Sequence, residues 1–180
     1  MSKQSHKALF LDRDGIINID HGYVSKVEDF VFVERIFDFV KLFTQEGYVV
    51  FVVTNQSGIG RGYYSQEDFE TLTAFMLKGF EAQDIHIEEV YFCPHAPEAK
   101  CHCRKPNIGM IEQALSTHHI DLTHSWMIGD KQSDIDLATN AGIGSTIAIG
   151  ERAIKGATLS FPNILNCKRF LEENEAIIKS

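Results

Sequence analysis

The sequence lacks a positive charge balance, long apolar runs and internal repeats. Its 180 residues carry 17 Lys and Arg against 25 Asp and Glu, which gives a net charge of −8. This acidity argues against non-specific binding to nucleic acid or to an anionic membrane surface. No apolar run approaches the roughly 18 residues of a membrane span. The polar first residues predict no signal peptide, so we expect a cytoplasmic protein.

Cysteine is scarce but clustered. Three of the four cysteines lie between Cys93 and Cys103, together with histidines. In a reducing compartment such a cluster indicates metal ligands rather than disulfides. Cys93 and His95 form one pair and Cys101 and Cys103 a second, joined by a five-residue loop. This set suits a closed, structural Zn²⁺ site. Free thiols in a loop are the alternative, and His102 is a possible substitute ligand.

Strand and helix patterns alternate along the chain. Short apolar runs predict strands over residues 8–11, 48–53, 87–92, 125–128 and 145–149. Amphipathic spacing predicts helices over residues 34–46, 66–83, 108–118, 134–141 and 168–179. Residues 14–34 have no helical period and are expected to form a loop or a small hairpin. The alternation favours an α/β protein with a doubly wound parallel sheet, in a single domain of residues 1–180.

Polar side chains follow three of the predicted strands. Asp12 and Asp14 follow the first strand, Thr54 the second and Asp130 the fourth. Because the carboxyl ends of parallel strands lie at one edge of a sheet, we expect these side chains to surround one cleft. The alternative is a solvated turn with surface carboxylates.

The paired carboxylates suit phosphoryl transfer. One of Asp12 and Asp14 can attack phosphorus as a nucleophile, and the other can protonate the leaving oxygen. Two carboxylates beside a phosphate dianion need a hard cation, and Mg²⁺ with Asp130 as a third carboxylate fits this need. Asp134 is a further ligand, an anchor for the ligands, or simply an acidic residue favoured by the dipole of its helix.

Several cations and polar groups could hold phosphate oxygens. Lys105 offers a compact charge and Arg104 a bidentate fork, and their position directly after the cysteine cluster argues against a solvated pair. The Thr54 hydroxyl and the Asn55 amide follow the second strand, although a polar turn is the alternative. Arg61 lies in the glycine-rich stretch 58–62, which lacks the spacing of a dinucleotide-binding loop.

These motifs together resemble those of the haloacid dehalogenase (HAD) superfamily of phosphatases, over residues 9–149. The matching segments are Asp12-Arg13-Asp14-Gly15, Thr54-Asn55, Arg104-Lys105-Pro106 and Gly129-Asp130. The resemblance implies a Rossmann-like sheet without a large cap domain. It also implies a phospho-aspartyl intermediate on Asp12 and an acid/base role for Asp14. Thr54 and Lys105 would stabilise the phosphoryl group, with Mg²⁺ on Asp12, Asp130 and the Asp14 carbonyl.

Within the superfamily, the zinc-binding loop is similar to that of small capless enzymes of the histidinol-phosphatase-like subfamily. Residues 20–23 and 54–62 look like those of a heptose-bisphosphate phosphatase in this subfamily. The resemblance implies removal of the 7-phosphate of a heptose 1,7-bisphosphate, a step towards nucleotide-activated heptose for lipopolysaccharide-type carbohydrate. Hydrolysis of histidinol phosphate in histidine biosynthesis is the alternative, and the short gap between the two ligand pairs favours it. The implied substrate contacts are Asp20, His21, Gly22, Tyr23, Asn55, Gln56, Ser57, Arg61, Arg104 and Lys131.

A third hypothesis comes from a different class of protein. A zinc-stapled binding module that has lost catalysis would have no need of four converging charged residues, so the intact Asp12, Asp14, Lys105 and Asp130 argue against it. We expect a monomer, because no helix has a surplus apolar face. Its partner would be a small sugar phosphate, whose negative charge suits cations concentrated in an otherwise acidic protein.

Overall fold

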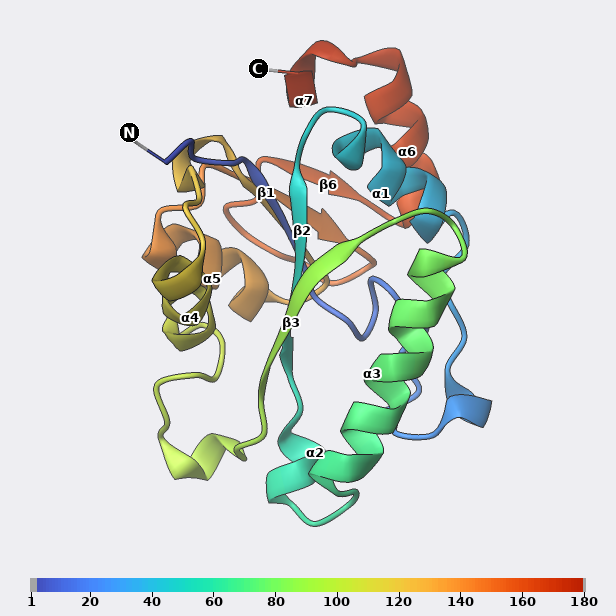
Figure 1. Ribbon diagram of the computed structural model, residues 1–180, viewed down its shortest axis with the longest axis vertical. Helices are drawn as coiled ribbons and strands as arrows, with labels where there is room; N and C mark the ends of the chain where they lie inside the picture. The colour runs from blue at the N-terminus through green and yellow to red at the C-terminus, as the bar shows by residue number, and fades with distance from the viewer. Residues whose placement is uncertain (1–2, 180) are drawn as a thin grey trace.

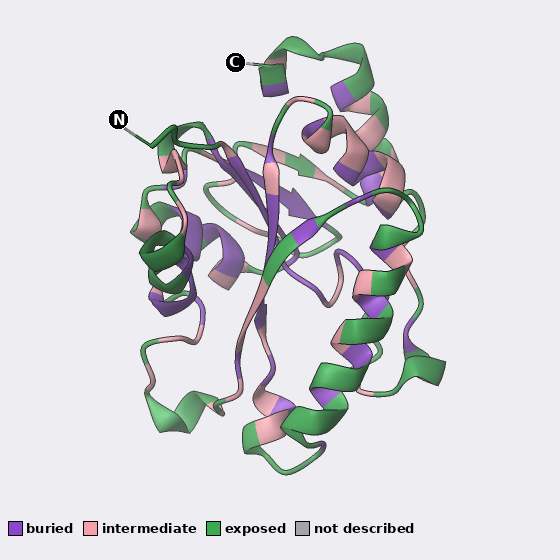
Figure 2. Cartoon of the chain, viewed as in Figure 1, coloured by how far each residue is buried: buried purple, intermediate pink, exposed green. Residues whose placement is uncertain are grey.

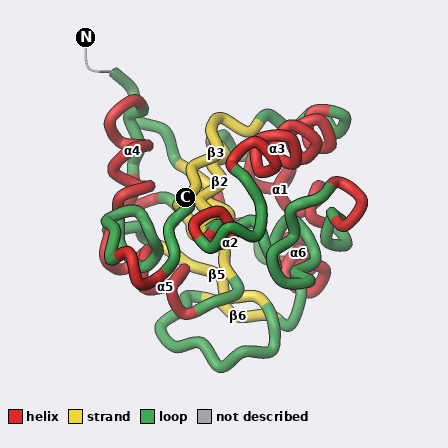
Figure 3. The backbone as a smooth tube through the Cα atoms, turned by 90° about the horizontal axis from the view of Figure 1, so that it is seen from below, coloured by secondary structure: helices red, strands yellow, loops and turns green. Residues whose placement is uncertain are grey.

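The computed structural model describes residues 3–179 and places one parallel β-sheet between two layers of helices (Figures 1 and 3). The sheet has six strands in the order β3-β2-β1-β4-β5-β6. These are β1 (Ala8–Leu11), β2 (Val49–Asn55), β3 (Ile87–Cys93), β4 (Trp126–Gly129), β5 (Ser145–Ile149) and β6 (Leu159–Phe161). The order reverses at β1, which lies between β2 and β4. Ligands of open α/β sheets bind at such a switch point.

The helices divide between the two faces of the sheet. One face is covered by α1 (Ile36–Thr44), α3 (Gln66–Glu81) and α6 (Ile164–Glu173), and the other by α4 (Gly109–Thr117) and α5 (Gln132–Ala141) (Figure 3). The shorter elements are α2 (Ser57–Gly60), α7 (Ala176–Lys179), and the 3-10 turns η1 (Val27–Asp29), η2 (Pro97–Ala99) and η3 (Leu122–His124). None of the helices in the described part of the chain is long and apolar enough to cross a membrane.

The central strands are buried on both sides. Leu9 and Leu11 face the layer of α1, α3 and α6, whereas Phe10 and Phe51 face α4 and α5. All four side chains are fully buried, and Figure 2 shows the buried residues concentrated on the strands and the inner faces of the helices. Burying a side chain of this size contributes about 1.5–3 kcal/mol. A short, uniformly apolar run therefore makes a stable central strand.

The structure confirms the predicted α/β fold, with small differences in its elements. Strand β6 has three residues and was missed, because so short a run gives no clear period. The helix predicted over residues 108–118 is α4, Gly109–Thr117, and it follows a cis peptide bond between Lys105 and Pro106. The last helix begins earlier than predicted, at Ile164, where the Asn163 side chain caps it.

The segment between β1 and α1 is the predicted small hairpin. Ile19 donates its N–H to the Val31 carbonyl at 2.8 Å, and Val33 donates to the Ile17 carbonyl at 2.8 Å. The segments after β1 and β3 are short loops at the carboxyl edge of the sheet, drawn at the bottom of Figure 1. Neither holds a cap domain in the described residues, so the cleft at this edge is covered by loops alone.

Candidate active site

Three strand ends meet at the carboxyl edge of the sheet, as the sequence predicts. Leu11 is in register with Val52 on β2 and with Ile128 on β4. The residues that follow β1 and β4, Asp12 and Asp130, therefore enter the same space. Asp12 is 5% exposed and Asp130 is 7% exposed, so both carboxylates are withdrawn from water.

Lys105 reaches across the site and joins two of the carboxylates. Its Nζ donates to Asp12 Oδ1 at 2.9 Å, to Asp134 Oδ1 at 2.7 Å and to the Val53 carbonyl at 2.9 Å. The lysine is almost fully buried. Asp134 also accepts from the Lys131 backbone N–H at 3.1 Å. Asp134 therefore anchors Lys105 at the start of α5, and its carboxylate also stays a candidate ligand for a metal ion.

The burial of these charges shifts their pKa values. Burial raises the pKa of Asp12 well above its usual range; Lys105 opposes this rise, and Asp134, Asp130 and Asp14 add to it. Burial alone would lower the pKa of Lys105, but Asp12 and Asp134 more than offset this and raise it. The lysine is therefore always charged, and its environment holds more negative than positive charge.

The acidic residues have the donor set of a site for a hard cation. Asp12, Asp130 and Asp134 each offer a carboxylate oxygen, and these oxygens lie within 4.8 Å of one another. Asp130 Oδ1 is buried and has no hydrogen-bond partner among residues 3–179. Gly15 has φ +88°, and a Cβ there would overlap the Asp130 carboxylate. Oxygen ligands and an unpartnered buried carboxylate oxygen suit Mg²⁺.

Asp14 is held differently from the other carboxylates. Its Oδ1 accepts from Arg13 Nη2 at 2.8 Å and from Asn18 Nδ2 at 3.0 Å, and its Oδ2 accepts from Gln56 Nε2 at 3.0 Å. Arg13 is 1% exposed and also donates to the Val24 carbonyl at 2.7 Å. The burial of Arg13 could not be predicted from the sequence, because arginine is normally exposed unless it is paired.

A second arginine was also missed by the sequence analysis. Arg152 follows β5, and its Nη1 donates to Asp130 Oδ2 at 2.9 Å and to the Asp130 carbonyl at 3.1 Å. It belongs to no recognisable motif. Only the position of β5 beside β4 brings the two residues together.

A cavity of about 280 Å³ is lined by Asp14 and by polar and charged residues of the surrounding loops. Nine of the ten predicted substrate contacts line it, and His21 does not. Three cations, Arg61, Arg104 and Lys131, line it, and Arg104 Nη1 is a buried nitrogen that has no hydrogen-bond partner in the described part of the chain. The full lining is Asp14, Asp20, Gly22, Tyr23, Asn55, Gln56, Ser57, Arg61, Tyr64, Arg104, Lys131 and Ser133. An acidic protein thus concentrates positive charge at the mouth of its cleft.

Thr54 and Asn55 connect the end of β2 with the rest of the site. Thr54 is fully buried, and its Oγ1 accepts from Gln56 Nε2 at 2.9 Å. Asn55 Oδ1 accepts from the Lys105 backbone N–H at 3.0 Å. The loop that carries Lys105 is therefore fastened to the strand end beside the nucleophile.

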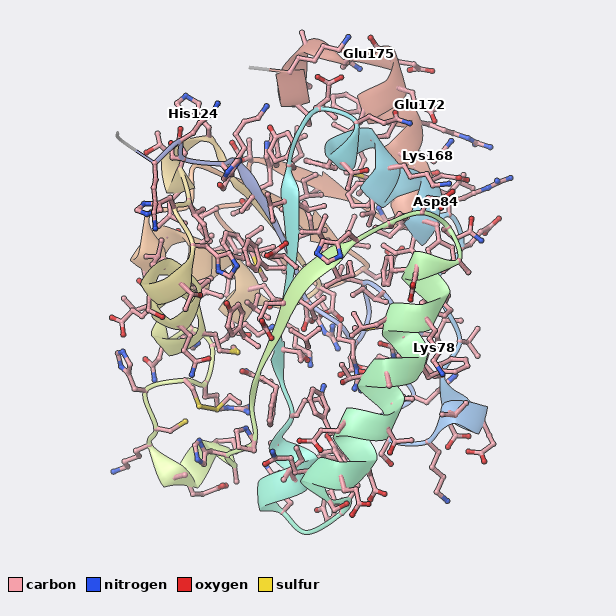
Figure 4. The ribbon with its side chains drawn as sticks, in the orientation of Figure 1. Lys78, Asp84, His124, Lys168, Glu172 and Glu175 are labelled. Atoms are coloured by element: carbon pink, nitrogen blue, oxygen red, sulfur yellow. A yellow bond between two sulfur atoms is a disulfide. The ribbon has the colours of Figure 1, made fainter. Side chains whose placement is uncertain are left out.

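The predicted zinc ligands converge at the end of β3. One ligand atom from each of Cys93, His95, Cys101 and Cys103 lies within 4.8 Å of the others. His102 instead pairs with Glu112 at 2.7 Å and faces outward, which favours His95 as the fourth ligand. The prediction of thiols without disulfides needs correction, because a disulfide joins Cys93 and Cys103 here (yellow bond, Figure 4). Sulfurs brought together as metal ligands are also close enough to be oxidised to a disulfide.

The strand order and the charged residues at the carboxyl ends of β1 and β4 define a HAD-like hydrolase. The HAD-hydrolase-like family model matches residues 102–150. A relative from Campylobacter jejuni, named D-glycero-alpha-D-manno-heptose-1,7-bisphosphate 7-phosphatase, is 45% identical over 94% of this chain and 98% of its own. A Helicobacter pylori relative, named for the beta form of that substrate, is 45% identical over 93% of this chain and 95% of its own.

A solved structure shares the fold. It is D,D-heptose 1,7-bisphosphate phosphatase from B. bronchiseptica, complexed with magnesium and phosphate, with a TM-score of 0.82 at 23% identity over 93% of this chain and 99% of that one. The chain belongs to the heptose-1,7-bisphosphate 7-phosphatase family of HAD-like phosphatases.

Proposed function

We propose that the protein removes the 7-phosphate of D-glycero-D-manno-heptose 1,7-bisphosphate through a phospho-aspartyl intermediate. The observation that carries this proposal is a buried carboxylate, Asp12, that bonds to Lys105 and lies two residues before Asp14, which lines a cavity together with three cations. The names of the 45% identical relatives support the substrate. The product would serve the synthesis of nucleotide-activated heptose for lipopolysaccharide-type carbohydrate.

Asp12 is the proposed nucleophile. Its Oδ1 accepts from Lys105 Nζ and from the Arg13 backbone N–H, both at 2.9 Å. These bonds leave Oδ2 to attack phosphorus, which forms the acyl phosphate while the bond to the sugar oxygen breaks. Lys105 and the Thr54 hydroxyl would stabilise the negative charge on the phosphoryl oxygens.

Asp14 is the proposed acid and base. Protonated, it gives its proton to the departing sugar oxygen, and as a carboxylate it then takes a proton from the water that attacks the acyl phosphate. Water attack releases inorganic phosphate and restores Asp12. The bonds from Arg13, Asn18 and Gln56 hold the Asp14 carboxyl group in a defined place during both steps.

Mg²⁺ is the cation that suits these carboxylates. Asp12, Asp130 and the Asp14 carbonyl would hold it. When bound, it would neutralise charge between the nucleophile and the phosphate dianion and so lower the repulsion between them. Asp134 would support this arrangement indirectly, because it accepts a hydrogen bond from Lys105 Nζ.

Arg61, Arg104 and Lys131 are the proposed contacts to the substrate's anionic groups. A bisphosphate has a second phosphate far from the reacting one, and a ring of cations at the mouth suits it better than it suits the cationic amine of histidinol phosphate. The remaining contacts proposed from the sequence are Asp20, His21, Gly22, Tyr23, Asn55, Gln56 and Ser57.

The cysteine cluster is the proposed structural Zn²⁺ site. Three sulfurs and one imidazole nitrogen make a closed tetrahedral set, which leaves no position for water. The site would fix the loop that ends in Arg104 and Lys105, because Cys103 directly precedes them. Bound zinc and the disulfide are alternative states of Cys93 and Cys103.

Phosphate release from a panel of esters, with and without Mg²⁺, tests the proposed function. We expect heptose 1,7-bisphosphate to be hydrolysed faster than histidinol phosphate, only with Mg²⁺, and not at all by Asp12→Asn. A preference for histidinol phosphate would select the alternative substrate. An inactive parent protein would favour the binding module. One domain of residues 1–180, a monomeric state and a cytoplasmic location stay predictions from the sequence.

A further inference from the structure

All polar atoms of the Gln56 side chain are used inside the protein. Gln56 directly follows β2 and is 2% exposed. Its Nε2 donates to Asp14 Oδ2 at 3.0 Å and to Thr54 Oγ1 at 2.9 Å, and its Oε1 accepts from the Tyr64 hydroxyl at 2.5 Å. Its backbone N–H donates to the Cys93 carbonyl at 2.8 Å. Both hydrogens of its amide NH₂ group are therefore used inside the protein, and neither is left to donate to a sugar.

The direction of these hydrogen bonds is set by Tyr64. The amide oxygen of Gln56 can only accept, so the Tyr64 hydroxyl must donate to it. The amide is then fixed with its NH₂ group towards Asp14 and Thr54. Because the Thr54 oxygen accepts from this NH₂ group, the Thr54 hydroxyl hydrogen is left to donate elsewhere. Thr54 has no other side-chain hydrogen bond to the described residues.

Tyr64 is itself firmly placed. It is 9% exposed, and a Cβ at Gly58 would overlap its ring. Burial raises the pKa of the Tyr64 hydroxyl to about 12. The hydroxyl therefore keeps its proton throughout the pH range in which a phosphatase is assayed, and it remains a donor to Gln56.

We propose that Gln56 and Tyr64 are positioning residues, which direct the Thr54 hydroxyl hydrogen towards the phosphoryl group and hold Asp14 beside the leaving oxygen. This inference rests on the proposed function, since it takes Thr54 and Asp14 as the groups that meet the substrate. It changes the expectation for Gln56, from a contact with the substrate to a support for two residues that contact it.

The first test compares two neighbouring tyrosines. Tyr64→Phe removes the donor to Gln56, whereas Tyr63→Phe alters a tyrosine that is 61% exposed and outside these bonds. We expect Tyr64→Phe to lower kcat about 3–10-fold with KM within about twofold, because only the positioning of reacting groups is lost. Tyr63→Phe should match the parent. Equal kcat values for the two variants would overturn the role of Tyr64.

The second test asks whether Tyr64 acts through Gln56. Gln56→Leu has a similar volume without the amide, and we expect it to lower kcat about 10–100-fold. The double variant should then be no slower than Gln56→Leu alone, because Tyr64 has nothing left to orient. Additive losses in kcat would overturn the inference. Melting temperatures of all variants separate these effects from loss of folding, and Tyr64→Phe remains informative if Gln56→Leu does not fold.

Assays on two different esters test this inference independently of the proposed substrate. All variants are assayed on heptose 1,7-bisphosphate and on a small aryl phosphate with Mg²⁺. If the parent hydrolyses only the aryl ester, the proposed substrate is wrong, but the ratio of kcat values between variants still tests the positioning role. If the parent prefers the heptose and the Tyr64 and Gln56 variants keep its kcat, only the positioning role is wrong.

Discussion

Replacing Lys105 by methionine removes the charge that joins the buried carboxylates while keeping most of the side-chain volume. The Nζ bonds to Asp12, Asp134 and the Val53 carbonyl are all lost. Asp12 and Asp134 stay 5% and 1% exposed, so water does not replace the ammonium group. Removing one partner of a buried ion pair costs about 3–5 kcal/mol, because it leaves an uncompensated buried charge.

This loss should be visible as a lower melting temperature. One kcal/mol shifts Tm by about 2–4 °C in a domain of this size, so we expect Lys105→Met to melt roughly 10 °C below the parent at pH 7.5. We also expect kcat to fall, by more than the loss of stability explains. A charged donor aimed at a transferring phosphoryl group is worth about 10²–10³ in kcat.

The pH dependence of this loss of stability follows from the pKa of Asp12. Burial raises the folded pKa of Asp12 above its unfolded value of 3.8, and Lys105 is the group that opposes this rise. Without Lys105 the folded pKa rises further, so the folded protein binds a proton that the unfolded chain releases. Stability then falls as pH rises from 3.8 through the folded pKa. The difference in Tm between Lys105→Met and the parent should therefore be smaller at pH 5 than at pH 8.

Thermal melts of the parent, Lys105→Met and Lys131→Met at pH 5, 6.5 and 8 provide the assay. Lys131→Met is the matched control, because it removes an exposed lysine of the same site that makes no side-chain hydrogen bond in the described residues. It should melt within about 2 °C of the parent, as surface substitutions usually do. If Lys105→Met also melted within 2 °C of the parent at every pH, the argument from buried charge would be refuted.

Three further predictions test other parts of the site. Gly15→Ala should abolish detectable Mg²⁺ binding in calorimetry and lower Tm, because the new Cβ overlaps the Asp130 carboxylate at φ +88°; unchanged binding would contradict this placement. Cys101→Ala should reduce bound zinc, measured by mass spectrometry under reducing conditions, from one ion per chain to none, with Cys167→Ala as the unaffected control. Arg104→Ala should raise KM for the bisphosphate about 10-fold or more, with a smaller effect on an ester that carries one phosphate.

The sequence predicted the strand ends because their signals are local. A buried strand reads as a continuous apolar run, and Asp12 and Asp130 follow such runs directly. The parallel order of β2, β1 and β4 then brings the strand ends together without further information. The zinc-binding loop could be predicted in the same way, since its four proposed ligands lie within eleven consecutive residues, 93–103.

The contacts that support these residues could not be predicted from the sequence. Each joins two residues whose separation along the chain follows no general rule. Arg13 is buried only because the hairpin after β1 folds over it and offers the Val24 carbonyl. Arg152 meets Asp130 only because β5 lies beside β4. The family resemblance implied that Gln56 contacts the substrate, but its hydrogen bond from Tyr64, which follows the α2 turn, could not be inferred from the sequence.

The residues proposed to carry out the reaction are buried, whereas residues that could select the substrate are exposed. Asp12 and Thr54 lie at strand ends and Lys105 in the loop before α4, and all three are buried, so a change at any of them is costly. The relatives named for the alpha and the beta forms of the heptose bisphosphate are equally similar to this chain, at 45% identity. The two forms differ at C1, far from the reacting phosphate at C7. We predict that exposed residues lining the cavity, such as Arg61 and Tyr23, select between them, so that substitutions there change the preferred form while leaving kcat on small esters unchanged.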